Sequence, residues 1–179
     1  MTEHLREEVL KSEVVFQGRL LTICVDRVRL PDGVESTREV VAHPGAVAMV
    51  PLLDAEHVLL VRQWRHPAGR ALLEIPAGTL SPGEDPRDCA TRELMEEIAY
   101  RPRRLTPLTA MFLAPGYSSE LLHVFLAEDL IPEKLAHDED ERIDIVTVRW
   151  EDIDALMRNG EIADAKTISG LLLARARLG

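Results

Sequence analysis

Residues 78 to 100 have the sequence GTLSPGEDPRDCATRELMEEIAY and form the strongest local pattern in this chain of 179 residues. Asp85 is a favourable N-cap, and Pro86 follows it at the position where proline is preferred at a helix start. Apolar residues then recur every four positions, which places them on one face of a helix: Ala90, Leu94 and Ile98. The pattern therefore predicts a helix that begins at Asp85 and ends before Pro102.

A second face of this predicted helix is acidic. Glu93 and Glu97 are one helical turn apart, and Glu96 lies beside them. Like charges at this spacing destabilise an isolated helix by a few tenths of a kcal/mol each, so a cation or a basic partner is expected opposite them. Oxygen ligands suit hard cations such as Mg²⁺ or Mn²⁺. The alternative is an ordinary solvated acidic face.

The rest of the chain alternates between apolar runs and helical patterns. Residues 14–41 are predicted to form short strands, because β-branched runs are broken there by glycine and by a Pro-Asp-Gly turn signal. The apolar run 46–53 is typical of a buried strand, and 58–61 is expected to pair with it as a hairpin. The remaining predicted elements are strands at 121–127 and 143–150 and helices at 151–159 and 164–177. Together they predict an α/β sandwich.

Composition limits the possible functions. The net charge of −10 and the pI near 5.1 disfavour a duplex nucleic-acid binder, which needs a basic face for phosphates. Residues 78–100 and 133–144 each contain six acidic and two basic residues, and thus account for −8 of that charge. No apolar run approaches the roughly 20 residues of a membrane span, and the charged first residues do not resemble a signal peptide. Cys24 and Cys89 lack CxxC spacing and are expected to be free thiols. We therefore expect a cytoplasmic protein without nucleic-acid or membrane partners.

The pattern in residues 78–100 resembles the signature of the Nudix hydrolases, G-x5-E-x7-R-E-U-x-E-E-x-G-U, where U is a bulky apolar residue. The matching residues are Gly78, Glu84, Arg92, Glu93, Glu96 and Glu97, with Leu94 and Tyr100 at bulky positions. Ala99 replaces the family's glycine at the helix end, where a left-handed alanine costs about 1 kcal/mol. The resemblance implies a Nudix-type α/β/α sandwich with a mixed β-sheet at residues 44–179. It also implies a small, dimerising β-rich appendage at residues 1–43.

Flanking segments resemble the ADP-ribose pyrophosphatase branch of this family. These segments are His43-Pro-Gly-Ala-Val-Ala, Val61-Arg-Gln-Trp-Arg65, Leu73-Glu-Ile-Pro-Ala-Gly78, Ala114-Pro-Gly-Tyr-Ser-Ser-Glu120 and the acidic run at 138–143. The resemblance implies Mg²⁺-dependent cleavage of ADP-ribose to AMP and ribose 5-phosphate, with Mn²⁺ as the alternative to Mg²⁺. Another nucleoside diphosphate sugar or a dinucleotide is the alternative substrate. A ligand-binding sensor that has kept the fold is a third reading, which the intact glutamates disfavour.

The resemblance also implies roles for single residues. The implied metal ligands are the carbonyl of Ala77 and the carboxylates of Glu93, Glu96, Glu97 and Glu141. Gly78, Glu84 and Arg92 are implied to support the signature, with Glu84 and Arg92 as an ion pair that fixes the loop on the helix. The alternative for this pair is an exposed contact of little energetic value.

A carboxylate must also orient or deprotonate the attacking water. In this branch it comes from the acidic loop, so the resemblance points to Glu139 as the general base. Glu120 is a rival, and the signature glutamates are a third possibility. The acidic loop could equally be a solvated charge run.

Substrate contacts are expected outside the signature. Arg65 resembles the family's phosphate-contacting arginine, and a planar guanidinium suits paired phosphate oxygens. Ser118 is implied to contact substrate from the segment before Glu120. Related enzymes exchange the β-rich appendage across a homodimer, so Phe16 is expected to stack on adenine and Glu39 to accept from its amino group. Each of these residues could instead be an ordinary surface or strand residue.

Overall fold

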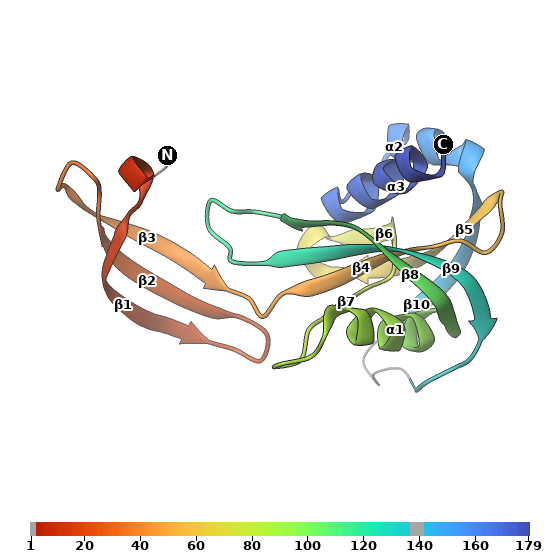
Figure 1. Ribbon diagram of the computed structural model, residues 1–179, viewed down its shortest axis with the longest axis horizontal. Coiled ribbons are helices and arrows are strands. Elements are labelled where there is room, and N and C mark those ends of the chain that lie inside the picture. The colour runs from red at the N-terminus through yellow and green to blue at the C-terminus, as the bar shows by residue number, and fades with distance from the viewer. Residues whose placement is uncertain (1–2, 137–141) are drawn as a thin grey trace. The chain divides into compact units, whose positions relative to one another are not determined.

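The computed structural model describes residues 3–136 and 142–179, which divide into two compact units. Unit 1 comprises Met1–Gly45 together with Phe112–Leu121, and unit 2 comprises Ala46–Met111 together with Leu122–Gly179. Figure 1 shows the elements of each unit. The two units are described separately below.

Unit 1 is built on an antiparallel sheet in the order β1-β2-β3. Its strands are β1 (Glu8–Gln17), β2 (Thr22–Arg29) and β3 (Glu35–Ala42), preceded by the 3-10 helix η1 (Glu3–Leu5). The predicted turn between β2 and β3 is present, because Leu30 N–H donates to Val34 O and Gly33 takes a φ of 89°. The loop that follows β8 belongs to this unit, since Val41 N–H donates to Tyr117 O. The strands predicted within residues 14–41 are confirmed.

Unit 2 contains two sheets. One has the order β7-β4-β9-β8 and the other β10-β5-β6 among the described residues. β4 pairs with β9 in parallel and with β7 antiparallel, so the first sheet is mixed. The strands are β4 (Ala46–Pro51), β5 (His57–Arg65), β6 (Arg70–Glu74), β7 (Ala77–Thr79), β8 (Tyr100–Phe112), β9 (Leu121–Pro132) and β10 (Ile143–Arg149).

The predicted hairpin between residues 46–53 and 58–61 is wrong. β4 and β5 lie in different sheets, and only an isolated bridge joins Leu52 to Val58 in the described chain. β4 takes β9 as its partner, from more than seventy residues further along, with Ala46 opposite Leu122. A buried strand that is apolar on both faces fits a parallel neighbour as well as a hairpin neighbour, so its composition does not determine the pairing.

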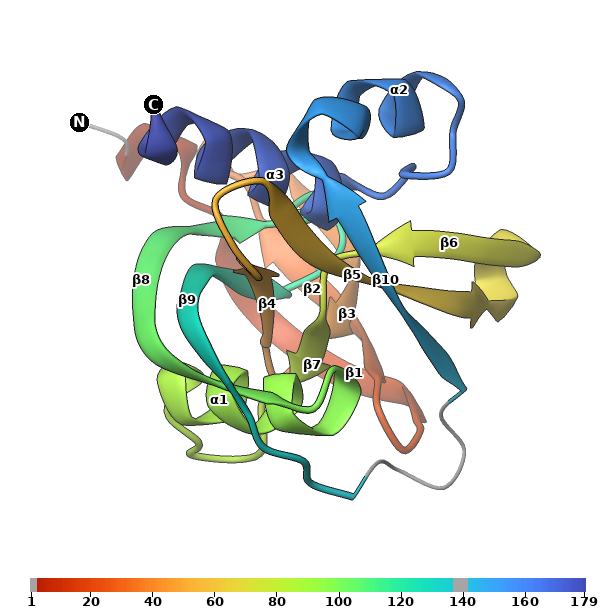
Figure 2. The same ribbon diagram turned by 90° about the vertical axis from the view of Figure 1, so that its right-hand side faces the viewer.

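Helices cover both sides of the sheets in unit 2 (Figures 1 and 2). α1 (Pro86–Glu97) lies on one side, and α3 (Ala165–Leu178) lies on the other with α2 (Ile153–Arg158). The short 3-10 helices are η2 (His66–Ala68) and η3 (Trp150–Asp152). The predicted α/β/α sandwich with a mixed sheet is confirmed. Within the described ranges, no helix has the length and apolar character that a membrane span requires.

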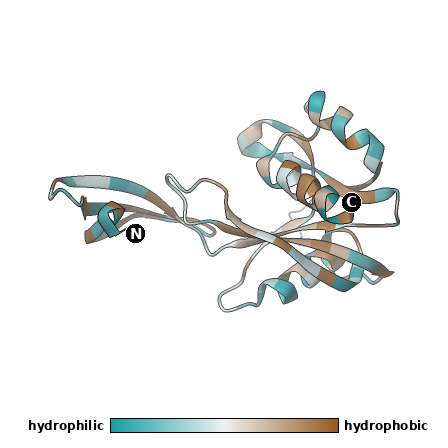
Figure 3. Cartoon of the chain, turned by 45° about the horizontal axis from the view of Figure 1, so that its top comes forward, coloured by the Kyte–Doolittle hydropathy of each residue, from teal (hydrophilic) through white to brown (hydrophobic). Residues whose placement is uncertain are grey.

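The core of unit 2 forms where α1 packs on the strands. Ala90, Leu94 and Ile98, the predicted apolar face, are completely buried. They share a cluster with residues of β4, β5 and β9, namely Val47, Met49, Leu59, Val61, Phe125 and Ala127. Figure 3 shows these central strands as largely hydrophobic. Full burial of a leucine or isoleucine side chain contributes about 1.5–3 kcal/mol, so the core fixes α1 on the sheets.

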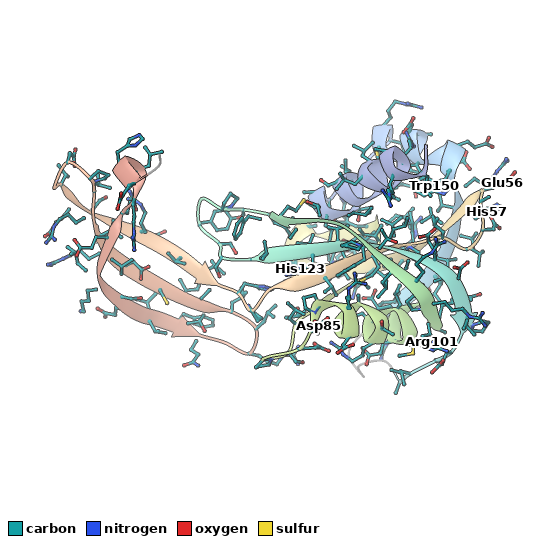
Figure 4. The ribbon with its side chains drawn as sticks, viewed as in Figure 1. Glu56, His57, Asp85, Arg101, His123 and Trp150 are labelled. Carbon is teal, nitrogen blue, oxygen red and sulfur yellow. The ribbon has the colours of Figure 1, made fainter. Side chains whose placement is uncertain are left out.

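Single residues determine where α1 begins and where it ends. The Asp85 side chain caps the first turn by accepting a hydrogen bond from Arg87 N–H at 2.8 Å, as predicted. Ile98 is the C-cap, and Ala99 follows in the left-handed region with a φ of 61°. In Figure 4, Asp85 lies at the start of the helix and Arg101 lies just beyond its end. The helix therefore ends at Glu97, before Pro102 is reached, because the backbone turns at Ala99.

Candidate active site

The acidic face of α1 lies beside the short strand β7. Glu97 is only 4% exposed although it is a charged residue. Its carboxylate Oε2 accepts a hydrogen bond from Ala77 N–H at 3.1 Å. This contact joins the last turn of α1 to the first residue of β7, and it fixes the position of a buried carboxylate.

Gly78 allows a second close contact between the same two elements. A Cβ added to Gly78 would overlap the carboxylate of Glu93. The φ of Gly78 is not in the left-handed region, so the reason for glycine here is space rather than backbone freedom. The Glu93 side chain consequently lies directly over the β7 backbone.

Arg92 connects the loop before α1 to the acidic face. Its Nε and Nη2 donate to the two oxygens of Glu84 at 3.0 and 3.1 Å, which is the predicted ion pair. Its Nη1 donates to Glu93 at 2.7 Å and to Glu96 at 2.9 Å. One guanidinium therefore holds three carboxylates, and like-charge repulsion within the cluster is reduced.

These contacts shift the ionisation of both partners. The hydrogen bonds from Arg92 lower the pKa of Glu84 to about 2, and a further hydrogen bond from Ser81 N–H acts in the same direction. The hydrogen bond to Glu84 raises the pKa of Arg92 further above its ordinary value. Burial raises the pKa of the neighbouring Cys89 thiol to about 12. The pair is therefore fully charged at neutral pH, and Cys89 is a neutral core residue.

Arg65, at the end of β5, is held by a buried carboxylate. Its Nε donates to both oxygens of Glu74 at 3.1 Å, and its Nη2 donates to Oε2 at 2.7 Å. Lys166 Nζ, from α3, reaches the same Oε2 at 2.6 Å. Burial would raise the pKa of Glu74, but the hydrogen bond from Arg65 and the charge of Lys166 outweigh it and lower that pKa. Glu74 is thus a buried anion between two cations.

These groups meet at a pocket of about 370 Å³. It is lined by Arg65, Ala77, Gly78, Thr79, Ser81, Arg92, Glu93 and Glu96. Two arginines, Arg65 and Arg92, and two carboxylates, Glu93 and Glu96, therefore line the same space. A volume of this size falls in the range of small-molecule sites.

A second hollow lies at the other end of β5. It is lined by Ala55, Glu56, Arg149, Trp150 and Glu151. Figure 4 shows Glu56, His57 and Trp150 close together there. Arg149 pairs with Glu151 across 2.7 Å. The carboxylates of this hollow, Glu56 and Glu151, come from outside α1, whereas those at the Arg65 end of the strand, Glu93 and Glu96, lie on α1.

Several predicted site residues belong to unit 1. Phe16 lies on β1 opposite Ile23 and is 55% exposed, and Glu39 lies on β3 opposite Val25. Ser118 and Glu120 lie in the loop of unit 1, where Glu120 N–H donates to Ser118 Oγ at 3.2 Å. All of the contacts named here lie within unit 1. Glu139 and Glu141 lie outside the described residues.

Among the described residues, no group of three or more His, Cys, Asp or Glu side chains is arranged to hold a metal ion. Arg92 instead bridges Glu93 and Glu96. The donor chemistry nevertheless fits a hard divalent cation, since carboxylates are its preferred ligands. Gly78 allows the Glu93 carboxylate to lie against β7, and Glu97 is positioned against Ala77. The metal-ligand roles remain predictions.

The sequence reading missed Glu74 and Lys166. A signal for Glu74 was present, because it is a lone charge in the apolar run Leu72–Ile75, and a charge inside a buried strand needs a partner. Lys166 gave no such signal, since a lysine near a helix start is common on surfaces. Its side chain is only 14% exposed in the fold.

Comparison with known proteins gives the family. Residues 42–171 match the NUDIX domain, and residues 7–41 match the nucleoside diphosphate sugar hydrolase N-terminal domain. The first match alone spans more than half of the chain. The chain therefore belongs to the Nudix family and is a hydrolase of that family, whose members generally depend on divalent metal ions.

Individual relatives show which members of the family this chain is similar to. A Bacillus subtilis (strain 168) protein named ADP-ribose pyrophosphatase is 43% identical over 165 residues, which cover 91% of this chain and 89% of the relative. A protein of the same name from Mycobacterium tuberculosis (strain ATCC 25618 / H37Rv) is 38% identical over 182 residues, covering 98% and 86%. A solved structure described as an ADP compounds hydrolase matches with a TM-score of 0.87 and 30% identity, over 97% of this chain and 95% of that one. The resemblance drawn from the sequence is confirmed.

Proposed function

We propose that this hydrolase cleaves ADP-ribose to AMP and ribose 5-phosphate with Mg²⁺ as its metal. The main supporting observation is the pocket in which Arg65 faces the signature carboxylates Glu93 and Glu96. The names of two relatives that match most of this chain support the choice of substrate. Hydrolysis adds one water across the phosphoanhydride bond, so each product keeps one phosphate.

In this proposal the carboxylates of Glu93, Glu96, Glu97 and Glu141 and the carbonyl of Ala77 hold the metal. A bound divalent cation lowers the pKa of a water molecule and neutralises charge on the phosphates. Arg65 binds phosphate oxygens through the guanidinium surface that faces the pocket. Residues 78–100 contain four more acidic than basic residues, so an anionic substrate is repelled without the cation. Removal of metal by chelation should therefore weaken substrate binding as well as catalysis.

The general base is proposed to be Glu139, with Glu120 as the rival. If Glu139 deprotonates the water, Glu139→Gln should lower kcat by roughly 100-fold or more while metal affinity changes little. Glu120→Gln is the matched control and should retain most of the parent's kcat. Steady-state rates and calorimetric metal titration of both variants check this. Parent-like activity of Glu139→Gln together with a loss in Glu120→Gln would transfer the role to Glu120.

The alternative substrates are other nucleoside diphosphate sugars and dinucleotides. The solved structure described as an ADP compounds hydrolase supports these alternative substrates, since that name does not specify one compound. A panel of such compounds, ranked by kcat/KM under one metal concentration, separates the candidates. ADP-ribose should rank first. A sensor without catalytic activity would instead bind members of the panel and release no product.

The homodimer and the cytoplasmic setting are part of the same proposal. Val14, Val15 and Phe16 are all more than half exposed on β1, and a partner chain would cover such a group. The match of residues 7–41 to a separate N-terminal domain supports a division into a dimerising segment, 1–43, and a hydrolase domain, 44–179. Cys24 and Cys89 are free thiols, which suits a reducing compartment.

A further inference from the structure

We propose that Lys166 and Glu74 are positioning residues that set the orientation and the effective charge of Arg65 in the substrate pocket. Neither residue lines the pocket. This role of Lys166 and Glu74 rests on the proposed function, which assigns Arg65 to substrate phosphate.

Arg65 and Glu74 lie on the same face of the β5–β6 hairpin. Arg65 lies opposite Arg70, and Val61 lies opposite Glu74. Side chains alternate along a strand, so residues 61 and 65 share one face, and Glu74 shares it by cross-strand pairing. The Arg65 side chain can therefore extend along this face to the carboxylate of Glu74, and its hydrogen bonds confirm the contact.

Glu74 occupies one edge of the Arg65 guanidinium and leaves the other for substrate. Nε and Nη2 of Arg65 both donate to Glu74. Among the described residues, Nη1 has no hydrogen-bond partner. A carboxylate that binds one edge of a planar guanidinium fixes its plane, which lowers the conformational entropy lost when phosphate binds. Glu74 thus orients the group that faces the pocket.

Lys166 compensates the negative charge of Glu74 beside Arg65. A carboxylate that holds Arg65 also cancels its positive charge, which weakens attraction for phosphate. Lys166 Nζ contacts the same Oε2 atom at 2.6 Å and also Asp164 Oδ1 at 3.0 Å. With Arg65, Lys166, Glu74 and Asp164 all ionised, the cluster has no net charge. Without Lys166, Arg65 is the one remaining cation of this group of four beside two carboxylates, so less of its positive charge is available to phosphate.

The helix start holds Lys166 in place. The Asp164 side chain caps α3 by accepting from Thr167 N–H at 3.0 Å, and Thr167 Oγ1 accepts from Ile75 N–H at 3.0 Å. Thr167 is fully buried. Because Ile75 follows Glu74 directly, this contact fixes the first turn of α3 beside the end of β6. The C-terminal helix therefore contributes a charge to a pocket that it does not line.

The test compares Lys166→Met with Arg175→Met. Both remove one cation from α3, but Arg175 pairs with Asp154 at 2.9 Å, away from Glu74. Lys166→Met should raise KM for the best substrate of the panel about fivefold with kcat within about twofold of the parent. Lys166→Arg should restore most of the parent's KM. Arg175→Met should leave KM unchanged.

A double-mutant cycle distinguishes positioning from direct contact. In an Arg65→Ala background, Lys166→Met should have no further effect on KM, because Lys166 acts through Arg65. An unchanged KM in the single variant would overturn the inference. So would an equal effect in the Arg65→Ala background, which would mean that Lys166 acts on substrate directly. If Lys166→Met does not fold, as judged by its unfolding midpoint, Lys166→Gln replaces it.

Equilibrium binding of α,β-methylene ADP-ribose separates failure of this inference from failure of the proposed function. If the parent hydrolyses no compound of the panel but binds this analogue, the proposed function fails. The parent and the Lys166 and Arg65 variants are then compared by their Kd for the analogue in place of KM. A fivefold weaker Kd for Lys166→Met, absent in the Arg65→Ala background, still supports the inference. No binding by the parent would overturn both.

Discussion

At the scale of single residues, Gly78 has a strict steric requirement, because the site has no space for a side chain at this position. A methyl group at this position would displace the Glu93 carboxylate. Gly78→Ala should therefore lower kcat/KM roughly 100-fold, because catalytic geometry tolerates little displacement. It should also lower the free energy of unfolding by about 1–3 kcal/mol through overpacking.

Gly116→Ala is the control for this prediction, since an added Cβ there meets open space and the backbone is not left-handed. Its unfolding free energy should change by less than about 1 kcal/mol. Denaturant unfolding and steady-state kinetics of both variants give the comparison. A Gly78→Ala protein with the parent's activity and stability would contradict the proposed packing of Glu93.

Glu84 gives a prediction about pH. Its pKa falls from 4.5 to about 2 in the fold, chiefly through the hydrogen bonds from Arg92. A carboxylate with a lowered pKa stabilises the fold above its unfolded pKa, and this stability is lost as the pH falls towards the folded pKa. Glu84→Gln should thus cost about 1–2 kcal/mol at pH 7, after allowance for solvent screening. The cost should shrink between pH 4.5 and about 2.

Urea unfolding of parent and Glu84→Gln at pH 7, 5 and 3 measures this difference. Arg101 and Glu133 form a more exposed pair at 2.6 Å, so Glu133→Gln serves as the control with a small, nearly pH-independent effect. A difference between Glu84→Gln and the parent that grows as the pH falls from 5 to 3 would contradict the assignment.

The residues of the site differ in how far the sequence predicts them. Glu93, Glu96 and Glu97 are apparent from their spacing on one helix, because that contact is local. Arg65 and Glu74 lie on the two strands of one hairpin, whereas Lys166 lies 92 residues beyond Glu74 on a helix. The contact of Lys166 with Glu74 depends on tertiary packing, which no local pattern encodes. Only the family resemblance drew attention to Arg65.

At the scale of secondary-structure elements, the end of α1 shows how a departure from the family pattern is accommodated. Ala99 keeps the left-handed backbone that glycine would adopt more easily, with a φ of 61°. Ala99→Gly should raise the free energy of unfolding by about 1 kcal/mol and leave kcat unchanged. Thermal or denaturant unfolding measures the shift.

Ala176→Gly is the matched control, because the same substitution is made inside the right-handed helix α3. It should lower the unfolding free energy by up to about 1 kcal/mol. A destabilised Ala99→Gly would mean that the backbone at this position does not favour glycine.

The same scale explains the mispredicted hairpin. The helices at 86–97 and 165–178 follow from caps and periodicity, which are encoded within each segment. The pairing of β4 with β9 is encoded in neither strand, since both are apolar and many neighbours would suit them. Composition therefore predicts that such strands exist, but tertiary context decides their order in the sheet.

At the scale of the whole molecule, the exposed apolar residues of β1 predict a homodimer. The double variant Val14→Lys/Val15→Lys places a charge on each face of the strand, and should be monomeric at concentrations where the parent is a dimer. Each valine that is buried at an interface contributes about 1.5 kcal/mol or more, which two lysines would remove.

Glu13→Lys is the control, because Glu13 lies next to these valines and its side chain is 63% exposed. It should remain dimeric. Light scattering of the three proteins decides the question. A monomeric parent, or a dimeric double variant, would remove the support for Phe16 and Glu39 as contacts across subunits.

The structure shows where part of the net charge of −10 is located. Four of the acidic residues in 78–100 now have structural positions: Glu84 on Arg92, and Glu93, Glu96 and Glu97 along one face of α1. Two of these carboxylates, Glu93 and Glu96, line the pocket together with Arg65 and Arg92. In the proposed function, a divalent cation bound by the carboxylates adds positive charge that attracts an anionic substrate.

Release of AMP from ADP-ribose in the presence of Mg²⁺ tests the central claim most directly. The parent protein should produce AMP and ribose 5-phosphate in equal amounts, and chelation of the metal should stop the reaction. Glu97→Gln should lower the rate by roughly 100-fold or more, since it removes the charge of a buried carboxylate on α1. AMP release by the parent no faster than by Glu97→Gln would contradict the proposed function.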